Sequence, residues 1–232
     1  MQRVLVTGAN RGIGLEFVRQ LLVRGARVFA ACRQPGKALK LTELAAAHPG
    51  RLSVLPLDLD KERSIAELAR ETTDLTDALD LLINNGGVLV SGERYGELAA
   101  KTFAETFTTN VIGPLLLTQA LTPLLTRGQS PTVVNLSSDL GSLSKTTGFY
   151  TPSYAVSKAG LNMVTRLLAA QLDEAGVGVI SVNPGWVKTD MGGARAPVTP
   201  QASVCGMLTL IKGLQQRDSG RFFDYTGAEL DW

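Results

Sequence analysis

Short apolar runs alternate along this chain with longer segments in which apolar residues recur every three or four positions. The run Leu81-Leu82-Ile83 predicts a buried strand, whereas the segment from Phe17 to Leu22 has the apolar spacing of one helix face. Strands are predicted near residues 3–7, 27–32, 52–57, 80–84, 132–137, 177–183 and 221–225. Helices are predicted near residues 12–24, 38–47, 61–73, 98–126, 153–175 and 200–214.

The predicted strands are continuous apolar runs, as in Val133-Val134 and Val179-Ile180, and not alternating ones. This pattern is typical of parallel strands that are covered on both faces. Alternating strands and helices therefore predict an α/β fold, a Rossmann-like doubly wound sheet of about seven parallel strands with helices on both faces. We find no repeat or linker and interpret residues 1–232 as a single domain. Ligands of such sheets bind beyond the carboxyl ends of the strands.

Composition and charge narrow the classes of function. The formal net charge of +2 gives no reason to expect nucleic acid or an anionic membrane as partner. No apolar run approaches the ~20 residues of a membrane-spanning helix, and the first strand begins too early to leave room for a signal or transit peptide. Cys32 and Cys205 are far apart, so we expect no disulfide framework and a cytoplasmic location. With His48 as the single histidine, we expect no metal site and no triad chemistry.

A glycine-rich turn follows the first predicted strand and precedes the first predicted helix. Gly8, Gly12 and Gly14 differ in spacing from the commonest dinucleotide-binding pattern. Helix N-termini leave N–H groups unpaired and attract phosphate, and glycine lets a pyrophosphate approach the backbone. The alternative is a turn that needs glycine only for its own conformation.

Small and polar residues follow the other predicted strands as well. They are Cys32-Arg33 after the second strand, Asp58-Leu59 after the third, Asn84-Asn85-Gly86-Gly87 after the fourth, Ser137-Ser138 after the fifth and Asn183-Pro184-Gly185 after the sixth. Because parallel strands end at one edge of the sheet, these residues are predicted to meet where the fold places its ligand.

Tyr154 and Lys158 are predicted to lie on one face of a helix, because four residues separate them. A lysine ammonium favours the phenolate and is expected to lower the pKa of the tyrosine, which would suit it for acid–base catalysis. The alternative is an ordinary helix turn. Tyr150 serves as an internal comparison, because four residues after it stands Tyr154 and no lysine.

Two further polar residues have both a functional and a structural interpretation. Ser138 follows the fifth strand, where its hydroxyl can reach a substrate oxygen or can cap a turn. Asn110 falls inside the predicted 98–126 helix, where asparagine is unfavourable. It marks either a bent or surface position, or a residue that holds a water beside the lysine.

These motifs together resemble those of the short-chain dehydrogenase/reductase family along essentially the whole chain. Thr7 to Gly14 is similar to that family's TGxxxGIG cofactor turn, and Pro184 to Asp190 to its PGxVxTD segment. Residues 220–232 resemble the branch of C-factor-like proteins and sniffer-type carbonyl reductases. The resemblance implies a catalytic set of Asn110, Ser138, Tyr154 and Lys158. The cofactor-binding residues that we expect are Gly8, Asn10, Arg11, Gly12, Ile13, Gly14, Arg33, Asp58, Leu59, Asn85, Gly86, Tyr154, Lys158, Pro184, Gly185, Val187 and Thr189.

The chain departs from the family pattern at two places. Gly86 stands where the family usually has alanine, and we expect a modest effect on backbone freedom. The spacing between Ser138 and Tyr154 is three residues longer than usual, so the segment 142–153 must bulge. This leaves Ser137 as an alternative, although Gly141 stands at the usual offset from Ser138.

The cofactor implied by these residues is NADP(H). Enzymes of this fold that prefer NAD usually have an acid at the end of the second strand, whereas this chain has Arg33 there. Its guanidinium can bind a ribose 2′-phosphate, and Arg11 in the glycine turn is expected to face the same phosphate. The alternative is that both arginines are solvated surface charges.

The resemblance implies hydride transfer between NADP(H) and a small-molecule carbonyl compound. We expect a carbonyl reductase, and the alternative is an NAD(P)-binding signalling protein with little turnover. A substrate lid is predicted near residues 188–200, because the small residues in 191–197 offer little to pack. We also expect a homodimer that pairs the long helices through Leu115, Leu116, Leu117, Leu121, Met163, Leu167 and Leu168.

Overall fold

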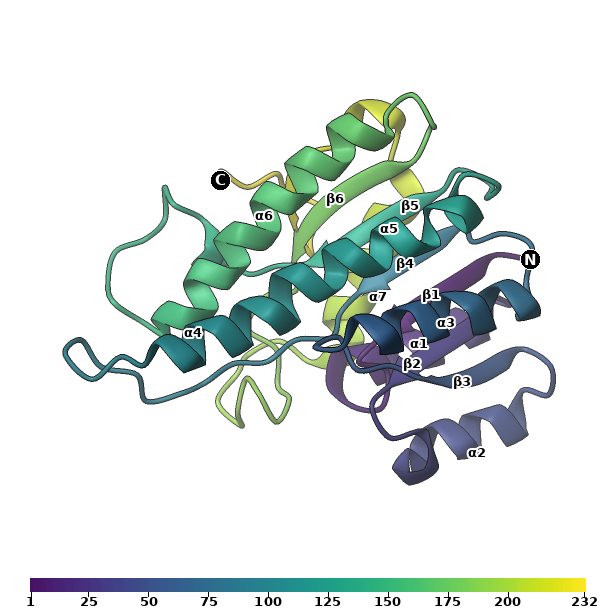
Figure 1. Cartoon of the computed structure of the whole chain (residues 1–232), viewed down its shortest axis with the longest axis horizontal. Helices are drawn as coiled ribbons and strands as arrows, with labels where there is room; N and C mark the ends of the chain where they lie inside the picture. Colours follow the sequence, from purple (N-terminus) through teal and green to yellow (C-terminus); the bar gives the residue numbers. More distant parts are fainter.

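Seven parallel strands form one continuous sheet in the computed structural model, which describes all residues from 1 to 232 (Figure 1). The strand order is β3-β2-β1-β4-β5-β6-β7, so the direction of winding reverses between β1 and β4. The strands are β1 (Arg3–Thr7), β2 (Arg27–Cys32), β3 (Leu52–Pro56), β4 (Leu81–Asn84), β5 (Thr132–Leu136), β6 (Gly178–Asn183) and β7 (Phe222–Asp224). The predicted doubly wound α/β fold is confirmed.

Helices cover both faces of this sheet, as the view in Figure 1 shows. The α-helices are α1 (Gly12–Val23), α2 (Leu39–Ala47), α3 (Glu62–Leu75), α4 (Ala100–Phe107), α5 (Gly113–Leu125), α6 (Pro152–Leu172) and α7 (Pro200–Gly213). Short 3-10 turns add η1 (Pro35–Lys37), η3 (Asp139–Gly141) and η4 (Gln216–Asp218), and η2 (Thr108–Ile112) is a π-helical turn. No helix is both long and apolar enough to span a lipid bilayer.

Two hydrophobic clusters hold the layers together, one on each face. Phe17 of α1 and Met207 of α7 are fully buried in the first cluster. Leu68 of α3 and Leu121 of α5 are fully buried in the second, which also takes in α6. The strands between them carry apolar side chains on both faces, which explains their continuous apolar runs.

The predicted helix over residues 98–126 is wrong in one respect, because α4 and α5 are separated by the π-helical turn η2. Gly113, directly after this turn, lies close to Leu59, because a Cβ at Gly113 would be 2.8 Å from Leu59 Cβ. Asn110 lies within η2 and is 1 % exposed. Burial excludes a surface position for Asn110, and the π-helical turn is the local irregularity at this asparagine. Such turns are often found at functional sites.

The amino edge of the sheet is fastened by one buried carboxylate. Asp80 accepts hydrogen bonds from the Arg3 main chain at 2.7 Å, from Arg3 Nη2 at 2.6 Å and from Gln129 N at 2.7 Å. Burial opposes ionisation of Asp80, but the bonds from Arg3 and Gln129 outweigh it and hold its pKa below the usual range. This cluster joins β1 to β4 and to the turn before β5.

Candidate active site

The glycine turn between β1 and α1 has the open backbone that its sequence predicts. Gly8 and Gly12 have positive φ angles of 62° and 53°. Gly14 is required for another reason, because a Cβ there would lie 2.3 Å from the carbonyl oxygen of Gly8. The first turn of α1 has no side-chain cap and no acidic residue. Its N–H groups and partial positive charge are thus available to an anion.

The end of β4 fastens this turn from the side. Asn85 Nδ2 donates to the carbonyl oxygens of Thr7 at 2.8 Å and Gly8 at 3.2 Å. Thr7 Oγ1 accepts from Gly86 N at 2.8 Å, a role that the sequence did not suggest. A Cβ at Gly86 would lie 2.9 Å from Leu59 Cδ1, so the absent side chain allows Leu59 to approach. Gly86 therefore has a packing role in addition to the expected backbone freedom.

The segment after β6 crosses over the glycine turn. A Cβ at Gly12 would lie 3.4 Å from Thr189 Cγ2, and Arg11 Nη1 forms an ion pair with Asp190 Oδ2 at 3.0 Å. Val187 bridges Val198, and this pairing closes the intervening loop at its base. The expectation that this loop has little to pack is partly wrong, because Ala196 is buried and Trp186 Nε1 donates to Gly192 O at 2.7 Å.

The remaining expected cofactor residues lie at the same edge. Gly185 has a positive φ of 77° and packs against the Tyr225 ring, and Pro184 O accepts from Ser203 Oγ at 2.7 Å. Ile13 packs partly into the first cluster, and Asn10 is exposed.

Asp58 and Arg33 lie near one another beyond β3 and β2. Burial opposes ionisation of Asp58, but the Lys61 ammonium, 3.0 Å away, and the backbone N–H of Asp60 outweigh it, and the pKa of Asp58 is lowered. The positive charge of Arg33 contributes to the same lowering. Arg33 is exposed and forms no ion pair. Of the two arginines expected to bind a phosphate, Arg33 is therefore the one without a competing carboxylate.

Tyr154, Lys158 and Ser138 are brought together by α6 and the end of β5. Lys158 Nζ lies 5.4 Å from the centroid of the Tyr154 ring and donates to Leu136 O at 2.6 Å. The hydroxyl of Ser138 donates to Asp139 Oδ1 at 3.1 Å and lies close enough to Tyr154 to lower the pKa of its phenol. Ser137 instead points toward Lys158 O and is buried. The geometry thus favours Ser138 over Ser137, as the position of Gly141 indicated.

The expected lowering of the Tyr154 pKa is not found. Burial raises the pKa of Tyr154 to about 12, the nearby negative charge of Asp139 acts in the same direction, and Ser138 only partly opposes these effects. Burial also lowers the pKa of Lys158 to about 8. The cost of burying the phenolate exceeds its attraction to the Lys158 ammonium, and the spacing of four residues reports only the attraction.

Asn110 joins the site through its side chain. Its Oδ1 accepts from Val88 N at 2.8 Å, and its Nδ2 donates to Val88 O at 2.9 Å and to Ser157 Oγ at 3.0 Å. A Cβ at Gly87 would lie 3.1 Å from Asn110 Oδ1 and 3.8 Å from Lys158 Nζ, so both residues flank this glycine. These hydrogen bonds engage both polar atoms of the Asn110 side chain. That Asn110 holds a water stays a prediction.

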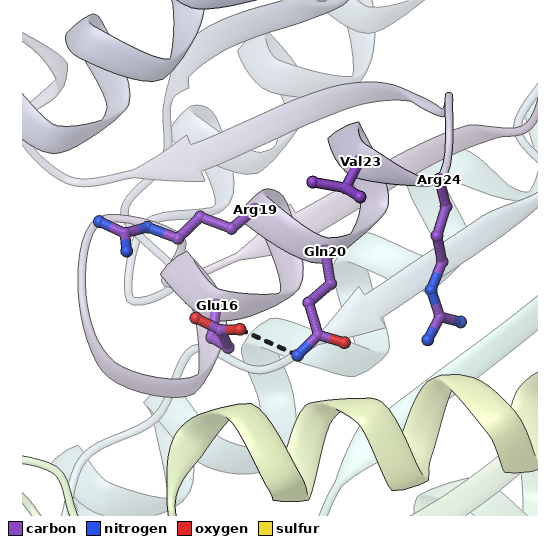
Figure 2. Close-up of a pocket in the computed structure, with 5 residues that line it drawn as sticks. All are labelled: Glu16, Arg19, Gln20, Val23 and Arg24. Carbon is purple, nitrogen blue, oxygen red and sulfur yellow. Dashed lines mark hydrogen bonds between the residues drawn. The ribbon is translucent and has the colours of Figure 1, made fainter.

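Other parts of the chain offer less for chemistry. A hollow on the side of α1 next to α7 is lined by Glu16, Arg19, Gln20, Val23 and Arg24 (Figure 2). Gln20 Nε2 donates to Glu16 at 2.9 Å, so the carboxylate of this hollow is already paired. No group of three His, Cys, Asp or Glu side chains is arranged to hold a metal ion.

Comparisons with known proteins agree with this geometry. The profile of the family described as short chain dehydrogenase matches residues 2–198. The C-signal of Myxococcus xanthus is 42% identical over 161 residues, which cover 69% of this chain and 97% of that protein. The structure of NADPH-bound carbonyl reductase from chicken fatty liver superposes with a TM-score of 0.95 at 38% identity, covering 100% of this chain and 99% of the other. The carbonyl reductase Sniffer of D. melanogaster has a TM-score of 0.95 at 31% identity, with full coverage of both chains. The chain belongs to the short-chain dehydrogenase/reductase family.

Proposed function

We propose that this chain is an oxidoreductase that uses NADPH to reduce the carbonyl group of an aldehyde, ketone or quinone. The observation that carries the proposal is the meeting of Tyr154, Lys158 and Ser138 at the sheet edge that also carries the glycine turn. The likeness to two carbonyl reductases, one of them with NADPH bound, supports the same reaction.

The residues of the glycine turn fit a dinucleotide. The uncapped first turn of α1 would bind a pyrophosphate, and the missing side chain of Gly12 allows Thr189 to approach the same turn. Asp58 would accept hydrogen bonds from the adenine, and Arg33 would bind the 2′-phosphate. When bound, the reduced nicotinamide supplies the hydride.

Tyr154 is suited to supply the proton in the reducing direction. A phenol with a pKa of about 12 is fully protonated at neutral pH, so the donor form is always present. Ser138 donates a hydrogen bond to the carbonyl oxygen and so fixes it beside the phenol. Lys158, with a pKa of about 8, is mostly protonated at neutral pH, and its ammonium stabilises the phenolate that remains after proton transfer.

The variant Tyr154→Phe tests this mechanism. It is expected to lower kcat at least about 100-fold, because the general acid is lost, while the Kd for NADPH changes less than about threefold. NADPH oxidation with a panel of aldehydes, ketones and quinones gives the first value, and cofactor fluorescence gives the second. A variant that retains the kcat of the unmodified protein would contradict the role of Tyr154.

The signalling alternative is not favoured. It predicts cofactor binding without turnover of any carbonyl compound, and it gives no reason for the phenol, ammonium and hydroxyl to converge on one point. The same substrate panel separates the two functions, because the proposed reductase must oxidise NADPH with at least one compound.

We further propose a homodimer, although not through all of the expected residues. Leu117, Leu121 and Leu168 are buried in the second core cluster and cannot pair subunits. The apolar residues exposed on α4, η2 and α6 are instead Phe107, Ile112, Val156, Met163 and Leu167. Light scattering at micromolar concentration is expected to give twice the chain mass, and Met163→Glu is expected to halve it. A monomer before substitution would rule out the dimer.

The chain is proposed to act as one domain, residues 1–232, with a lid near 188–200. Hydrogen exchange is expected to be fast in residues 191–197 and to slow when substrate and NADP⁺ are present. Equal protection with and without ligand would show that no lid closes.

A cytoplasmic location is also proposed, and it accords with the free thiols of Cys32 and Cys205. Cell fractionation with a tagged chain tests it.

A further inference from the structure

The helix that carries Tyr154 begins without a cap of its own. The residue before it, Thr151, has a φ of 39° and makes no side-chain cap hydrogen bond. The first N–H groups of a helix have no partner within the helix. Because Pro152 has no N–H, the first such group in α6 is that of Ser153. Ser153 is only 1 % exposed, so its N–H and hydroxyl need a partner from the protein.

Glu93 is that partner, although it lies sixty residues earlier in the chain. Its Oε2 accepts hydrogen bonds from Ser153 N at 3.2 Å and from Ser153 Oγ at 2.8 Å. A carboxylate at a helix N-terminus also interacts favourably with the partial positive charge there. Glu93 thus takes the position that a local Ser, Asp or Asn fills in most helices.

The segment that carries Glu93 is anchored at a second point of the site. This segment, residues 86–99, connects β4 to α4, and we call it the strap. Val88 near its start forms two hydrogen bonds with the Asn110 side chain. Tyr95 near its end packs edge-on against Phe149, with the ring centroids 5.6 Å apart. The strap is therefore joined to η2, to the 142–151 segment and to the first turn of α6.

We propose that Glu93 is a positioning residue, which fixes the first turn of α6 and so directs the Tyr154 phenol toward the carbonyl oxygen. The inference rests on the proposed function, because it assigns the proton transfer to Tyr154. Tyr154 follows Ser153 directly, so a loosened first turn displaces the phenol. A displacement of about 1 Å can reduce a rate 100-fold.

Three variants isolate this role. Glu93→Ala removes both bonds, whereas Glu93→Gln retains an acceptor oxygen at the same reach. Glu97→Ala is the matched control, because Glu97 is an exposed glutamate in the same strap with no side-chain partner. Ser153→Ala, alone and combined with Glu93→Ala, tests whether the two residues act together.

The expected result is a change in chemistry without a change in cofactor binding. Glu93→Ala lowers kcat about 10- to 100-fold and leaves the Kd for NADPH within about twofold. Glu93→Gln recovers kcat to within about threefold of the unmodified protein, and Glu97→Ala does not alter it. In the double variant, Ser153→Ala adds no further loss of kcat. A role limited to fastening the strap would instead lower the melting temperature and leave kcat unchanged in the folded fraction, which would overturn the proposal.

Hydrogen exchange gives a readout that does not depend on turnover. The Ser153 and Tyr154 amides are expected to exchange at least 10-fold faster in Glu93→Ala than in Glu97→Ala, with the last turns of α6 unchanged. Exchange that is equal in the two variants would overturn the positioning role even if the protein reduces carbonyl compounds. If no carbonyl compound is reduced by the unmodified protein, the proposed function fails, while the exchange measurement still decides whether Glu93 fixes the helix start.

Discussion

Replacing Arg33 with aspartate is expected to reverse the preference for NADPH over NADH. Arg33 is exposed and has no ion-pair partner, so it is free to meet a 2′-phosphate at the end of β2. Two unit charges at about 4 Å in water attract by about 1 kcal/mol, and a phosphate monoester carries about 1.5 to 2 negative charges at pH 7. Arg33 alone then contributes about 1.5–2 kcal/mol, or a preference of at least about tenfold.

Arg11 is expected to contribute less than Arg33. Its guanidinium is paired with Asp190 at 3.0 Å, and a phosphate must compete with that carboxylate. An exposed pair of this kind is worth about 0.2–1 kcal/mol, which is subtracted from the gain. Consequently Arg33→Ala should weaken the NADPH preference more than Arg11→Ala, and Asp190→Asn should strengthen it. Arg33→Asp replaces attraction by repulsion, so the ratio is expected to change by about 3–4 kcal/mol, several hundredfold.

The assay is kcat/KM with NADPH and with NADH at one ionic strength, because salt screens exposed charges over about 8 Å under physiological conditions. Arg24→Asp serves as the control, since Arg24 is an exposed arginine at the far end of α1 and the substitution changes the net charge equally. Equal use of both cofactors by the unmodified protein, or an unchanged ratio in Arg33→Asp, would refute the reasoning.

Four further predictions concern buried charges and the absence of a metal requirement. Lys158→Met should abolish turnover yet stabilise the ligand-free protein at pH 7 by about 1–3 kcal/mol, because burial lowers the Lys158 pKa to about 8. The free energy of unfolding of the unmodified protein should rise between about pH 8 and 10, because Lys158 is protonated in the unfolded chain over this range and largely neutral in the folded one. Urea denaturation measures this rise and the effect of Lys158→Met. Asp80→Asn should lower the free energy of unfolding by about 2–4 kcal/mol, since it leaves the Arg3 charge unpaired. Because the pKa of Asp80 is lowered in the folded protein, the difference between the two proteins should shrink as the pH falls below about 4. A difference that stays constant with pH would contradict this role of Asp80. EDTA should leave turnover unchanged, because the proposed mechanism uses no metal ion. A loss of activity that a divalent cation restores would contradict that.

The sequence by itself determined the fold and the spacing of Tyr154 and Lys158 on one helix. Continuous apolar strands, alternating with helices, dictate a parallel sheet covered on both faces, and seven strands were predicted within a residue or two of their bounds. Local rules also sufficed for the glycine turn and for the pairing of Tyr154 with Lys158, because both depend on neighbours within a few residues.

Tertiary structure alone decided what surrounds these groups. The pKa of Tyr154 is raised because the folded chain buries it, and no local sequence pattern reports burial. Leu117 and Met163 are both apolar residues of predicted helices, yet Leu117 is buried in the core and Met163 is exposed. The partners of Arg11 and Ser153, which are Asp190 and Glu93, lie 179 and 60 residues away along the chain. Contacts over such separations are fixed by the packing of whole elements, which places side chains together regardless of their order in the chain.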